Sequence, residues 1–515
     1  MNAPVVKLPC EGSSARPLIE VRAGELHTMA SEGEAALVTA GAPFYIRSGI
    51  VRPIVEDVPA AHGRRTKVAR LAEVTCDMLV DHLSRSADWT KFDGRKKRSV
   101  ATDPPRVVAA TIMSRDGEWS FPRLAGVITT PTLRPDGTIL SKPGYDRATQ
   151  LLLLDPPVLP AIPAKPSRAN AVDALALLDA LLVEFPFVDD ASRSVALSGL
   201  ITPVVRGAME VAPLHATSAP VAGSGKSYII DLASAISIGQ RAPVMAAGRD
   251  EAETEKRLVS ALLGGQPIIS IDNVNGELGG DFLCQMIERP LVTPRVLGVS
   301  KQARIESRAT CFATGNNIRL VGDMTRRVVL CSLDPNMERP ELRQFKASPF
   351  DAVLADRGKY IAAALTVVRA YAAAGFPNAL PALASFEDWS RLVRSALVWL
   401  GREDPVKTME AARSEDPITS QLRALFHAWH SGAASKELTA GGIKQLADET
   451  MQSNRIRPDL HQALLDVAEG RSGEIDGKRL GHYLGKHKGR VIDGLKLDVR
   501  VDAHSKQNLW MVVRV

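Results

Sequence analysis

The sequence has few cysteines, and they follow no pattern typical of a metal site or a disulfide framework. Its 515 residues include five cysteines, with no C-x-x-C pair and no histidine nearby at the spacing of metal ligands. This odd, scattered set favours a reducing compartment and argues against a zinc site. The five are Cys10, Cys76, Cys284, Cys311 and Cys331.

Long apolar runs are missing as well. No run approaches the roughly 20 residues that a membrane-spanning helix needs, and the apolar stretch Leu151–Leu154 leads directly into Asp155. The first residues, Met1–Pro4, are not a basic region followed by an apolar core, so we expect no signal peptide and no lipoprotein cysteine at Cys10. These absences predict a cytoplasmic protein with no membrane partner.

The charge is only mildly unbalanced. A net charge of +6 over the whole chain is weak evidence for a polyanionic partner. A hydrophobic content of 45% is ordinary for a globular protein, and the length indicates about three domains. The positions of the basic residues therefore carry more information than their number.

The most informative stretch is residues 211–227, an apolar run that passes through a loop of small residues into a helix. It fits the spacing G-x-x-x-x-G-K-[ST] with one departure, because Pro220 stands at the first glycine. Backbone N–H groups of such a loop curve around phosphate oxygens, while the lysine reaches the β- and γ-phosphates and the hydroxyl binds Mg²⁺. A glycine-rich turn without a ligand is the alternative. The residues expected to bind the nucleotide are Gly223, Ser224, Gly225, Lys226 and Ser227.

An apolar strand at residues 266–271 ends in Asp272 and Asn273. In phosphate-binding-loop enzymes an aspartate at the carboxyl end of a neighbouring strand holds Mg²⁺. We expect Asp272 to do so together with Ser227, the alternative being a capping aspartate. Asn273 stands where many ATPases have a glutamate, and an amide can orient water but cannot accept its proton. The rate of hydrolysis therefore stays open.

A third apolar segment, residues 308–317, ends in Gly315-Asn316-Asn317. Asn316, preferred slightly to Asn317, would bond the γ-phosphate or the attacking water; the alternative is a turn in which the Gly-Asn pair supplies positive φ. Further on, Arg326 and Arg327 precede a strand, where an arginine could reach the nucleotide of a neighbouring subunit. Ion pairing with Asp323 is the alternative reading.

Between these segments, residues 292–305 read as two short β-prone pieces around Gly298, which predicts an inserted hairpin. Lys301 and Arg304 near its tip would contact a nucleic-acid backbone if the hairpin points into a ring. A solvated surface hairpin is an equally weighted alternative.

The rest of the chain suggests how the domains are arranged. We predict an N-terminal α+β domain at 1–155, a Pro-rich linker at 156–168, an α/β nucleotide-binding core at 169–340, a helical domain at 341–415 and a winged-helix-like domain at 416–515. Within the first we expect a strand at 43–58, a helix at 68–83 and a β-meander at 126–154. Core strands are expected at 211–217, 242–246, 267–271, 309–313 and 327–332, with helices at 226–237, 250–264 and 279–289.

The last domain is expected to hold helices near 440–450, 458–468 and 476–486, followed by strands at 491–501 and 508–513. Its end is basic, which makes DNA contact plausible beside a purely structural role. The basic residues are Lys478, Arg479, Lys486, Lys488, Arg490, Lys496 and Lys506.

Taken together, Pro220–Ser227, Ile268–Asn273, Ala313–Asn317 and Asp323–Arg327 resemble the AAA+ core of superfamily 3 helicases, in particular primase-helicase-type ATPases of bacterial prophages and plasmids. The resemblance implies a homo-oligomeric ring, usually a hexamer, that binds ATP and Mg²⁺ between subunits and pulls single-stranded DNA with its hairpins. It implies that Asn316 acts as sensor 1 and that Arg326 or Arg327 acts in trans. No D-x-D carboxylate pair precedes Asp155, so priming would need a separate primase.

The leading hypothesis is therefore an ATP-dependent DNA helicase or translocase that serves replication of a mobile element in bacteria. An initiator or loader that remodels DNA without processive unwinding is a second hypothesis. A third is a nucleotide-gated regulatory assembly with little hydrolysis, which Asn273 motivates. A small-molecule kinase is the least favoured, because such an enzyme has no use for the flanking domains and the inserted hairpin.

Overall fold

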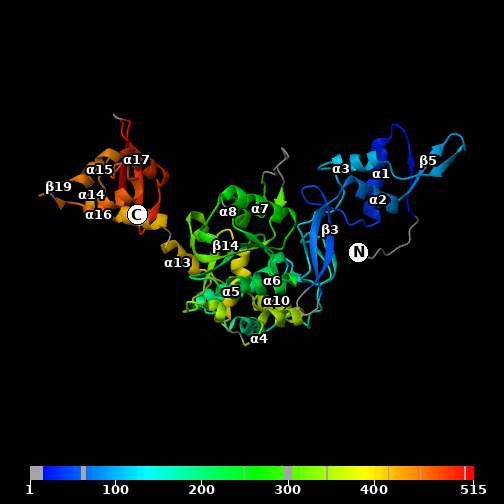
Figure 1. Cartoon of the computed structure of the whole chain (residues 1–515), viewed down its shortest axis with the longest axis horizontal. Coiled ribbons are helices and arrows are strands. Elements are labelled where there is room, and N and C mark those ends of the chain that lie inside the picture. The colour runs from blue at the N-terminus through cyan, green and yellow to red at the C-terminus, as the bar shows by residue number, and fades with distance from the viewer. Residues whose placement is uncertain are drawn as a thin grey trace. The chain divides into compact units, whose positions relative to one another are not determined.

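The computed structural model describes residues 16–59, 65–248, 250–294, 304–343, 346–415, 417–452, 454–503 and 506–515. The chain divides into two compact units (Figure 1). The first comprises Met1–Ile318 and Arg327–Met409, and the second comprises Arg319–Arg326 and Glu410–Val515. No described helix is long and apolar enough to cross a membrane.

A five-stranded parallel sheet is the centre of the larger unit. Its strands are β13 (Val244–Ala246), β14 (Ile268–Leu278), β17 (Thr310–Leu320), β12 (Leu214–Ala219) and β18 (Val328–Ser332), in that spatial order. Every residue of β12 is buried, as expected for a central strand of a parallel sheet that is covered on both faces. The predicted mixed α/β architecture is confirmed at this level.

Helices alternate with these strands along the chain. They are α5 (Asp190–Val205), α6 (Lys226–Ile238), α7 (Glu251–Leu263) and α8 (Asp281–Glu288). Asp250 caps α7 by accepting a hydrogen bond from Glu253 N–H, and such a cap satisfies one of the unpaired donors at a helix start. The predicted helices at 226–237, 250–264 and 279–289 are confirmed to within two residues.

The N-terminal region folds as small sheets packed against helices. Its elements are β1 (Leu18–Val21), α1 (Leu26–Thr39), β2 (Tyr45–Ile46), β3 (Ile50–Pro59), β4 (Arg65–Glu73), α2 (Cys76–Ser86), β5 (Asp88–Asp93), β6 (Arg98–Ala101) and α3 (Arg106–Ser114). Leu37, Leu83 and Ile112 are fully buried between the helices.

The predicted helix at 68–83 is wrong in its first half. Residues 65–73 form β4, which pairs antiparallel with β3 over nine positions, and the helix begins only after Thr75, whose hydroxyl accepts from Met78 N–H. The apolar residues of 68–83 recur at helical spacing, and this local pattern could not show the long-range pairing with β3 that makes residues 65–73 a strand.

The predicted meander at 126–154 is also corrected. Strand β7 (Gly126–Ile128) pairs in parallel with β11 (Leu151–Leu153), and β10 (Gly144–Asp146) pairs antiparallel with β11. Strands β8 (Thr132–Leu133) and β9 (Ile139–Leu140) form a separate hairpin, closed by the predicted turn, in which Gly137 N–H donates to the Arg134 carbonyl at 2.9 Å.

Two buried arginines join this N-terminal region to the ends of core helices. Arg47 donates to the carbonyl of Leu262 at 2.9 Å, near the end of α7. Arg357, at the start of α10 (Arg357–Ala373), donates to Ile236 at 2.9 Å and to Ser237 at 2.7 Å near the end of α6, while the Thr130 hydroxyl also donates to the Ser237 carbonyl. Guanidinium groups stabilise the negative end of a helix dipole there. Burial lowers the pKa of Arg47 and of Arg357 to about 10, so both stay charged at neutral pH.

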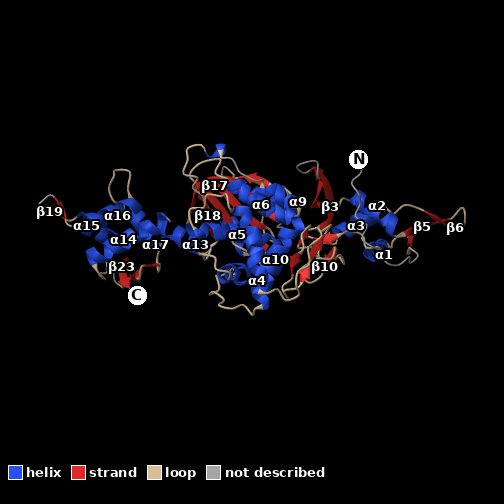
Figure 2. Cartoon of the chain, turned by 90° about the horizontal axis from the view of Figure 1, so that it is seen from below, coloured by secondary structure: helices blue, strands red, loops and turns tan. Residues whose placement is uncertain are grey.

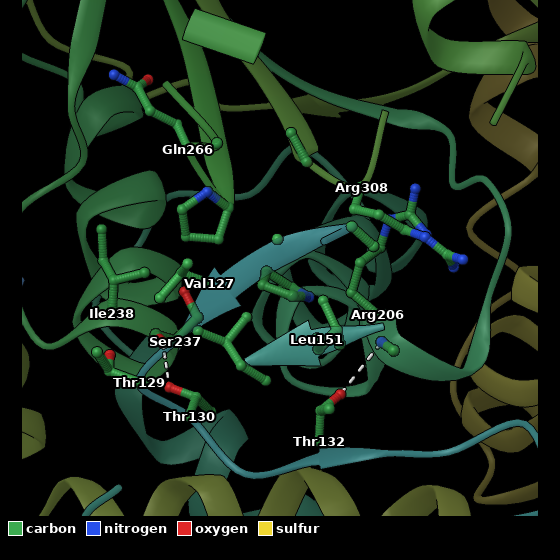
Figure 3. A pocket seen from close by; sticks show the side chains of 18 of the residues that line it. Val127, Thr129, Thr130, Thr132, Leu151, Arg206, Ser237, Ile238, Gln266 and Arg308 are labelled. Carbon is green, nitrogen blue, oxygen red and sulfur yellow. Dashed lines mark hydrogen bonds between the residues drawn. The ribbon is translucent and has the colours of Figure 1, made fainter. Parts of the chain in front are cut away.

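A cavity of about 50 Å³ lies beside these contacts (Figure 3). Its wall includes Thr129 and Thr130 on one side, close to Ser237 and Ile238 of α6, and Arg206 and Arg308 on the other. Arg206 donates to the carbonyls of Met209, Glu210 and Ser307, which accounts for a charge that is buried in an otherwise apolar region.

Helices follow the sheet in the larger unit. They are α9 (Pro349–Ala355), α10, α11 (Glu387–Trp389), a π-helix at Ser390–Arg394, α12 (Ser395–Trp399) and α13 (Lys407–Glu415), which crosses into the second unit. Helix α10 packs along α4 (Arg168–Asp179). Trp389 is fully buried, and its ring N–H donates to the Thr202 hydroxyl of α5 at 3.0 Å.

The second unit has its own hydrophobic core, and Figure 2 shows its helices and strands. It contains α14 (Pro417–Ala433), α15 (Ala440–Asp448), α16 (Pro458–Ala468), α17 (Gly477–Lys486) and an antiparallel sheet of β21 (Val491–Ile492), β22 (Leu495–Val501) and β23 (Asn508–Arg514), with a small β19–β20 hairpin (Thr450–Met451, Asn454–Arg455). Phe426, Leu464 and Leu480 are buried in the core.

One strand boundary in this unit differs from the prediction. The expected strand at 491–501 is a hairpin of β21 and β22, because Asp493 and Gly494 have φ values of 49° and 75° and Ile492 pairs with Leu495. An Asp-Gly pair with two positive φ angles is the typical two-residue turn. The dipeptide was a visible signal that the sequence analysis missed.

Candidate functional site

The loop between β12 and α6 has the backbone geometry of an anion-binding turn. Gly223 and Gly225 have φ values of 76° and 95°, a region that side chains other than glycine rarely adopt. A Cβ at Gly225 would lie 3.1 Å from the Phe185 ring, and one at Gly223 would lie 2.9 Å from the Glu341 backbone nitrogen. Both positions therefore require glycine for conformation and for space.

The loop keeps its amide donors available. Among the described residues, the backbone N–H groups of residues 222–227 donate no hydrogen bond of good geometry, whereas Tyr228 N–H already donates to the Gly225 carbonyl at 3.1 Å. The Ser224 hydroxyl donates to the Val221 carbonyl at 2.7 Å and closes the turn from inside. Consecutive free N–H groups at the positive end of a helix form a concave site for an anion.

Lys226 is the first residue of α6, and its ammonium group turns back over the loop. It donates to the Val221 carbonyl and to the Asn316 side-chain oxygen, both at 2.8 Å. Partial burial lowers the pKa of Lys226, and the nearby Asp272 carboxylate opposes that shift. The charge is thus held at the site by a carbonyl, an amide and a carboxylate.

A second group of side chains gathers around Asp272. The Thr314 hydroxyl donates to Asp272 Oδ1, the Ser227 hydroxyl lies 3.5 Å from the same atom, and Asn273 N–H donates to it at 3.0 Å. Thr314 is buried. In the described part of the chain no group of three or more His, Cys, Asp or Glu side chains could hold a metal ion. A hydroxyl and a single carboxylate form the type of incomplete oxygen set that binds Mg²⁺ together with phosphates and water.

Sheet topology brings these two groups together. Strand β17 lies between β12 and β14, and the register sets Ala219, the last residue of β12, opposite Asn316. The carboxyl ends of parallel strands meet at one edge of a sheet, where α/β proteins bind their ligands. The predicted residues Lys226, Ser227, Asp272 and Asn316 therefore lie together, and Thr314 joins them as a residue whose direct contact with Asp272 was not foreseen.

Two details differ from the sequence-based picture of this edge. Asp272 does not end its strand, because β14 continues to Leu278 through Asn273, whose φ is 57°. Asn273 is exposed. At the third segment the turn alternative is wrong, because Gly315, Asn316 and Asn317 all lie within β17, although Asn317 has a positive φ of 48°. Asn316 accepts a hydrogen bond from Lys226, and its role toward a phosphate or water stays a prediction.

The two arginines have different environments. Arg326 has a 39% exposed side chain and pairs at 3.3 Å with Asp323, the partner that the alternative reading named. The Arg327 side chain is only 5% exposed, and its Nε donates at 3.0 Å to Glu288 of α8. Arg327 is thus held by a carboxylate of its own chain, whereas the Arg326 pair is exposed; which of the two acts in trans stays a prediction.

The predicted hairpin is described only at its base. Strands β15 (Leu291–Val292) and β16 (Ile305–Glu306) pair antiparallel, and Arg304 beside them is exposed. Lys301 lies outside the described residues. The Arg304 carbonyl accepts from the Ser48 hydroxyl at 2.7 Å, and the Glu306 carbonyl accepts from Arg47 at 3.0 Å. The base of the hairpin is therefore held by the N-terminal region.

Comparisons with known proteins add little. No protein-family model matches the chain, and no curated protein is similar to it. Among solved structures, two apo structures of the C-terminal region of NrS-1 match weakly. One is 12% identical with a TM-score of 0.36 and covers 85% of this chain and 99% of its own; the other is 11% identical with a TM-score of 0.38 and covers 93% and 98%. Likenesses this weak assign neither a fold nor a function.

Proposed function

We propose that this protein is an ATP-dependent DNA translocase or helicase built on an AAA+ phosphate-binding-loop core. The observation that carries the proposal is the run of free N–H groups at residues 222–227 beside Lys226, with Asp272, Thr314 and Asn316 at the same sheet edge. Free amides and an ammonium group favour a polyphosphate, and the hydroxyl–carboxylate pair favours the Mg²⁺ that accompanies it.

In this proposal the amides and Lys226 bind the β- and γ-phosphates, and Ser227 and Asp272 hold Mg²⁺. The ammonium group exchanges its contacts with Val221 and Asn316 for phosphate oxygens, which leaves the Asn316 amide able to orient the γ-phosphate or the attacking water. Bound Mg²⁺ neutralises charge that develops on the phosphates. The protein's part is to position these groups before the reaction begins.

The motor function further requires a second subunit and DNA. Arg326 is the arginine proposed to act in trans, because its pairing with Asp323 is solvent-exposed and easily exchanged. A homo-oligomeric ring, most simply a hexamer, would place it at the neighbouring nucleotide. The hairpin that bears Lys301 and Arg304 would contact single-stranded DNA, with priming left to a separate primase, in replication of a bacterial mobile element.

A second function is favoured by one observation. Asn273, next to Asp272, is an exposed amide in the left-handed conformation and supplies no base for the attacking water. A nucleotide-gated DNA-binding initiator or regulatory assembly would bind ATP through the same loop and hydrolyse it slowly.

The experiment measures ATP binding and hydrolysis by the full chain, with and without single-stranded DNA. We expect DNA to stimulate hydrolysis and Lys226→Ala to abolish both binding and turnover, whereas Lys142→Ala, at an exposed lysine of the N-terminal region, leaves both unchanged. Tight ATP binding without DNA-stimulated turnover would refute the motor function and favour the nucleotide-gated assembly. ATP binding that survives in Lys226→Ala would refute the loop as the nucleotide site.

A further inference from the structure

Helix α17 of the second unit presents an unusually basic face. Residues 477–490, which comprise α17 (Gly477–Lys486) and the four residues after it, include five lysines and arginines and no aspartate or glutamate. Lys478, His482 and Lys486 follow one another every fourth residue, so they share one side of the helix, and all three are exposed. The opposite side is fixed in the core by Leu480 and Leu484, both fully buried.

The positive charges on this face are not used inside the protein. Within the described residues, no ion pair involves Lys478, Lys486 or Lys488, although the same unit pairs Arg423 with Asp493 and Arg500 with Glu437. Asp476, the nearest carboxylate in the sequence, caps the helix by accepting from the backbone N–H groups of Lys478 and Arg479. These hydrogen bonds lower the pKa of Asp476, whose carboxylate is engaged as the helix cap and forms no ion pair with the lysines among the described residues.

The face is also bare of bulky side chains. Gly477, Gly481 and Gly485 form a second row beside the lysines, and a Cβ at Gly477 or Gly485 would meet nothing within 4 Å. None of the three has a positive φ, so the backbone conformation does not explain them. Glycine weakens a helix interior. The folded unit therefore gains nothing visible from these glycines, whereas a partner that approaches the helix backbone closely does.

We propose that the α17 face docks duplex DNA, with the helix in the major groove and the lysines on the flanking phosphates. The major groove of B-form DNA is about 12 Å wide and admits an α-helix, and three lysines that form no ion pair among the described residues, Lys478, Lys486 and Lys488, complement its phosphates. This inference is independent of the proposed ATPase, because it concerns a different unit and a different form of DNA.

Other polyanions fit the face less well. Single-stranded DNA is bound by stacking bases on exposed aromatic rings, whereas the aromatic side chains nearest the face, Tyr483 and Trp510, are half-buried and buried. The major groove of A-form RNA is too deep and narrow for a helix. A membrane-binding helix carries large apolar residues opposite its basic ones, and here the apolar side of α17 is already buried in the core.

The test uses the full chain and four labelled probes, with binding followed by fluorescence anisotropy. The probes are a 30-base-pair DNA duplex of arbitrary sequence, the single strand of the same length, the matching RNA duplex and vesicles containing phosphatidylserine. The first variant is Lys478→Gln/Lys486→Gln/Lys488→Gln. Its matched control is Lys142→Gln/Lys165→Gln/Lys436→Gln, which removes the same charge from exposed lysines outside α17.

We expect the α17 triple variant to bind duplex DNA at least about tenfold more weakly, and the slope of log affinity against log salt to fall by roughly 2 to 3, since each phosphate contact contributes about 0.9. The control keeps wild-type affinity and slope. Gly485→Leu, which improves helix propensity and leaves the charge unchanged, weakens duplex binding without lowering thermal stability.

The proposal is overturned if the α17 triple variant binds the duplex as the control does. It is equally overturned if the variant loses affinity for the single strand, the RNA duplex or the vesicles as much as for duplex DNA, because the face is then not specific for B-form DNA. Lys226→Ala, tested together with the α17 variants, should keep duplex binding. The duplex-binding result can therefore be interpreted even if the ATPase proposal fails.

Discussion

Arg326 and Arg327 are neighbours in sequence that should respond to mutation in opposite ways. Arg327 is bound to Glu288, which also accepts a 2.6 Å hydrogen bond from the Ser385 hydroxyl. Arg327→Met removes the guanidinium from the largely buried Glu288 carboxylate, whose side chain is 15% exposed. Removing one partner of a buried ion pair costs about 3–5 kcal/mol. Arg326→Ala breaks a solvent-exposed pair, which contributes about 0–1 kcal/mol.

Activity should show the reverse order. An arginine that acts in trans accelerates phosphoryl transfer by roughly 10³ to 10⁵, so Arg326→Ala should lose at least about a hundredfold in DNA-stimulated turnover while it binds ATP normally. Arg327→Met, assayed well below its unfolding transition, should keep turnover within about threefold. Urea denaturation followed by tryptophan fluorescence measures the free energy of unfolding, and steady-state ATP hydrolysis measures turnover.

The double variant Arg327→Met/Glu288→Gln is the control for this reasoning. Because the glutamine removes the buried charge, the double variant should recover most of the stability that Arg327→Met loses. The reasoning fails if Arg327→Met unfolds at the wild-type urea concentration and yet loses turnover. That outcome would mean that Arg327 is the functional arginine and that it leaves its contact with Glu288 when the protein assembles.

Three further outcomes follow from the structure. Burial lowers the pKa of His215 on β12 to about 3, so as pH falls below about 6.5 the unfolded chain binds this proton and the folded chain does not. The contribution of His215 to stability should therefore be full above that pH and fall by about 1.4 kcal/mol per pH unit below it. Urea denaturation at a series of pH values should show a smaller slope in His215→Gln. Gly225→Ala should weaken ATP binding at least about tenfold, which calorimetric titration measures. Gly375 has a similar φ of 79°, and a Cβ there would meet no atom within 4 Å, so Gly375→Ala should lower stability by about 1–2 kcal/mol without changing ATP binding. Thermal melting measures that loss. Arg357→Met should destabilise the larger unit by about 2–3 kcal/mol, because the carbonyls at the end of α6 lose a charged donor, and hydrogen exchange should show the last turn of α6 opening first.

Local sequence signals predicted the strand–loop–helix order at residues 211–237 well. The order of strand, small-residue loop, lysine and helix is written in consecutive residues, and β12 and α6 lie where that order places them. The proximity of Asp272 and Asn316 to the loop also followed, because parallel strands end at one sheet edge. The roles of these residues in binding ATP and Mg²⁺ stay predictions.

What the sequence could not show depended on distant partners. Strand β4 was read as helix because its partner β3 sets its conformation and its own apolar spacing does not. Arg327 seemed as available as Arg326 because Glu288, 39 residues earlier, is invisible to a local pattern. Positive φ at Asn273 likewise depends on how β14 bends past Asp272 and cannot be read from one amide in the sequence.

Thr130 and Arg357 contact the C-terminal end of α6, so this helix connects two parts of the larger unit. Its 13 residues span about 20 Å, with the loop between β12 and α6 at one end and the Thr130–Ser237–Arg357 contacts at the other. If the loop binds phosphate as proposed, a displacement of α6 along its axis would be transmitted to Thr130. It would thereby reach the N-terminal region, which also holds the base of the hairpin through Arg47 and Ser48.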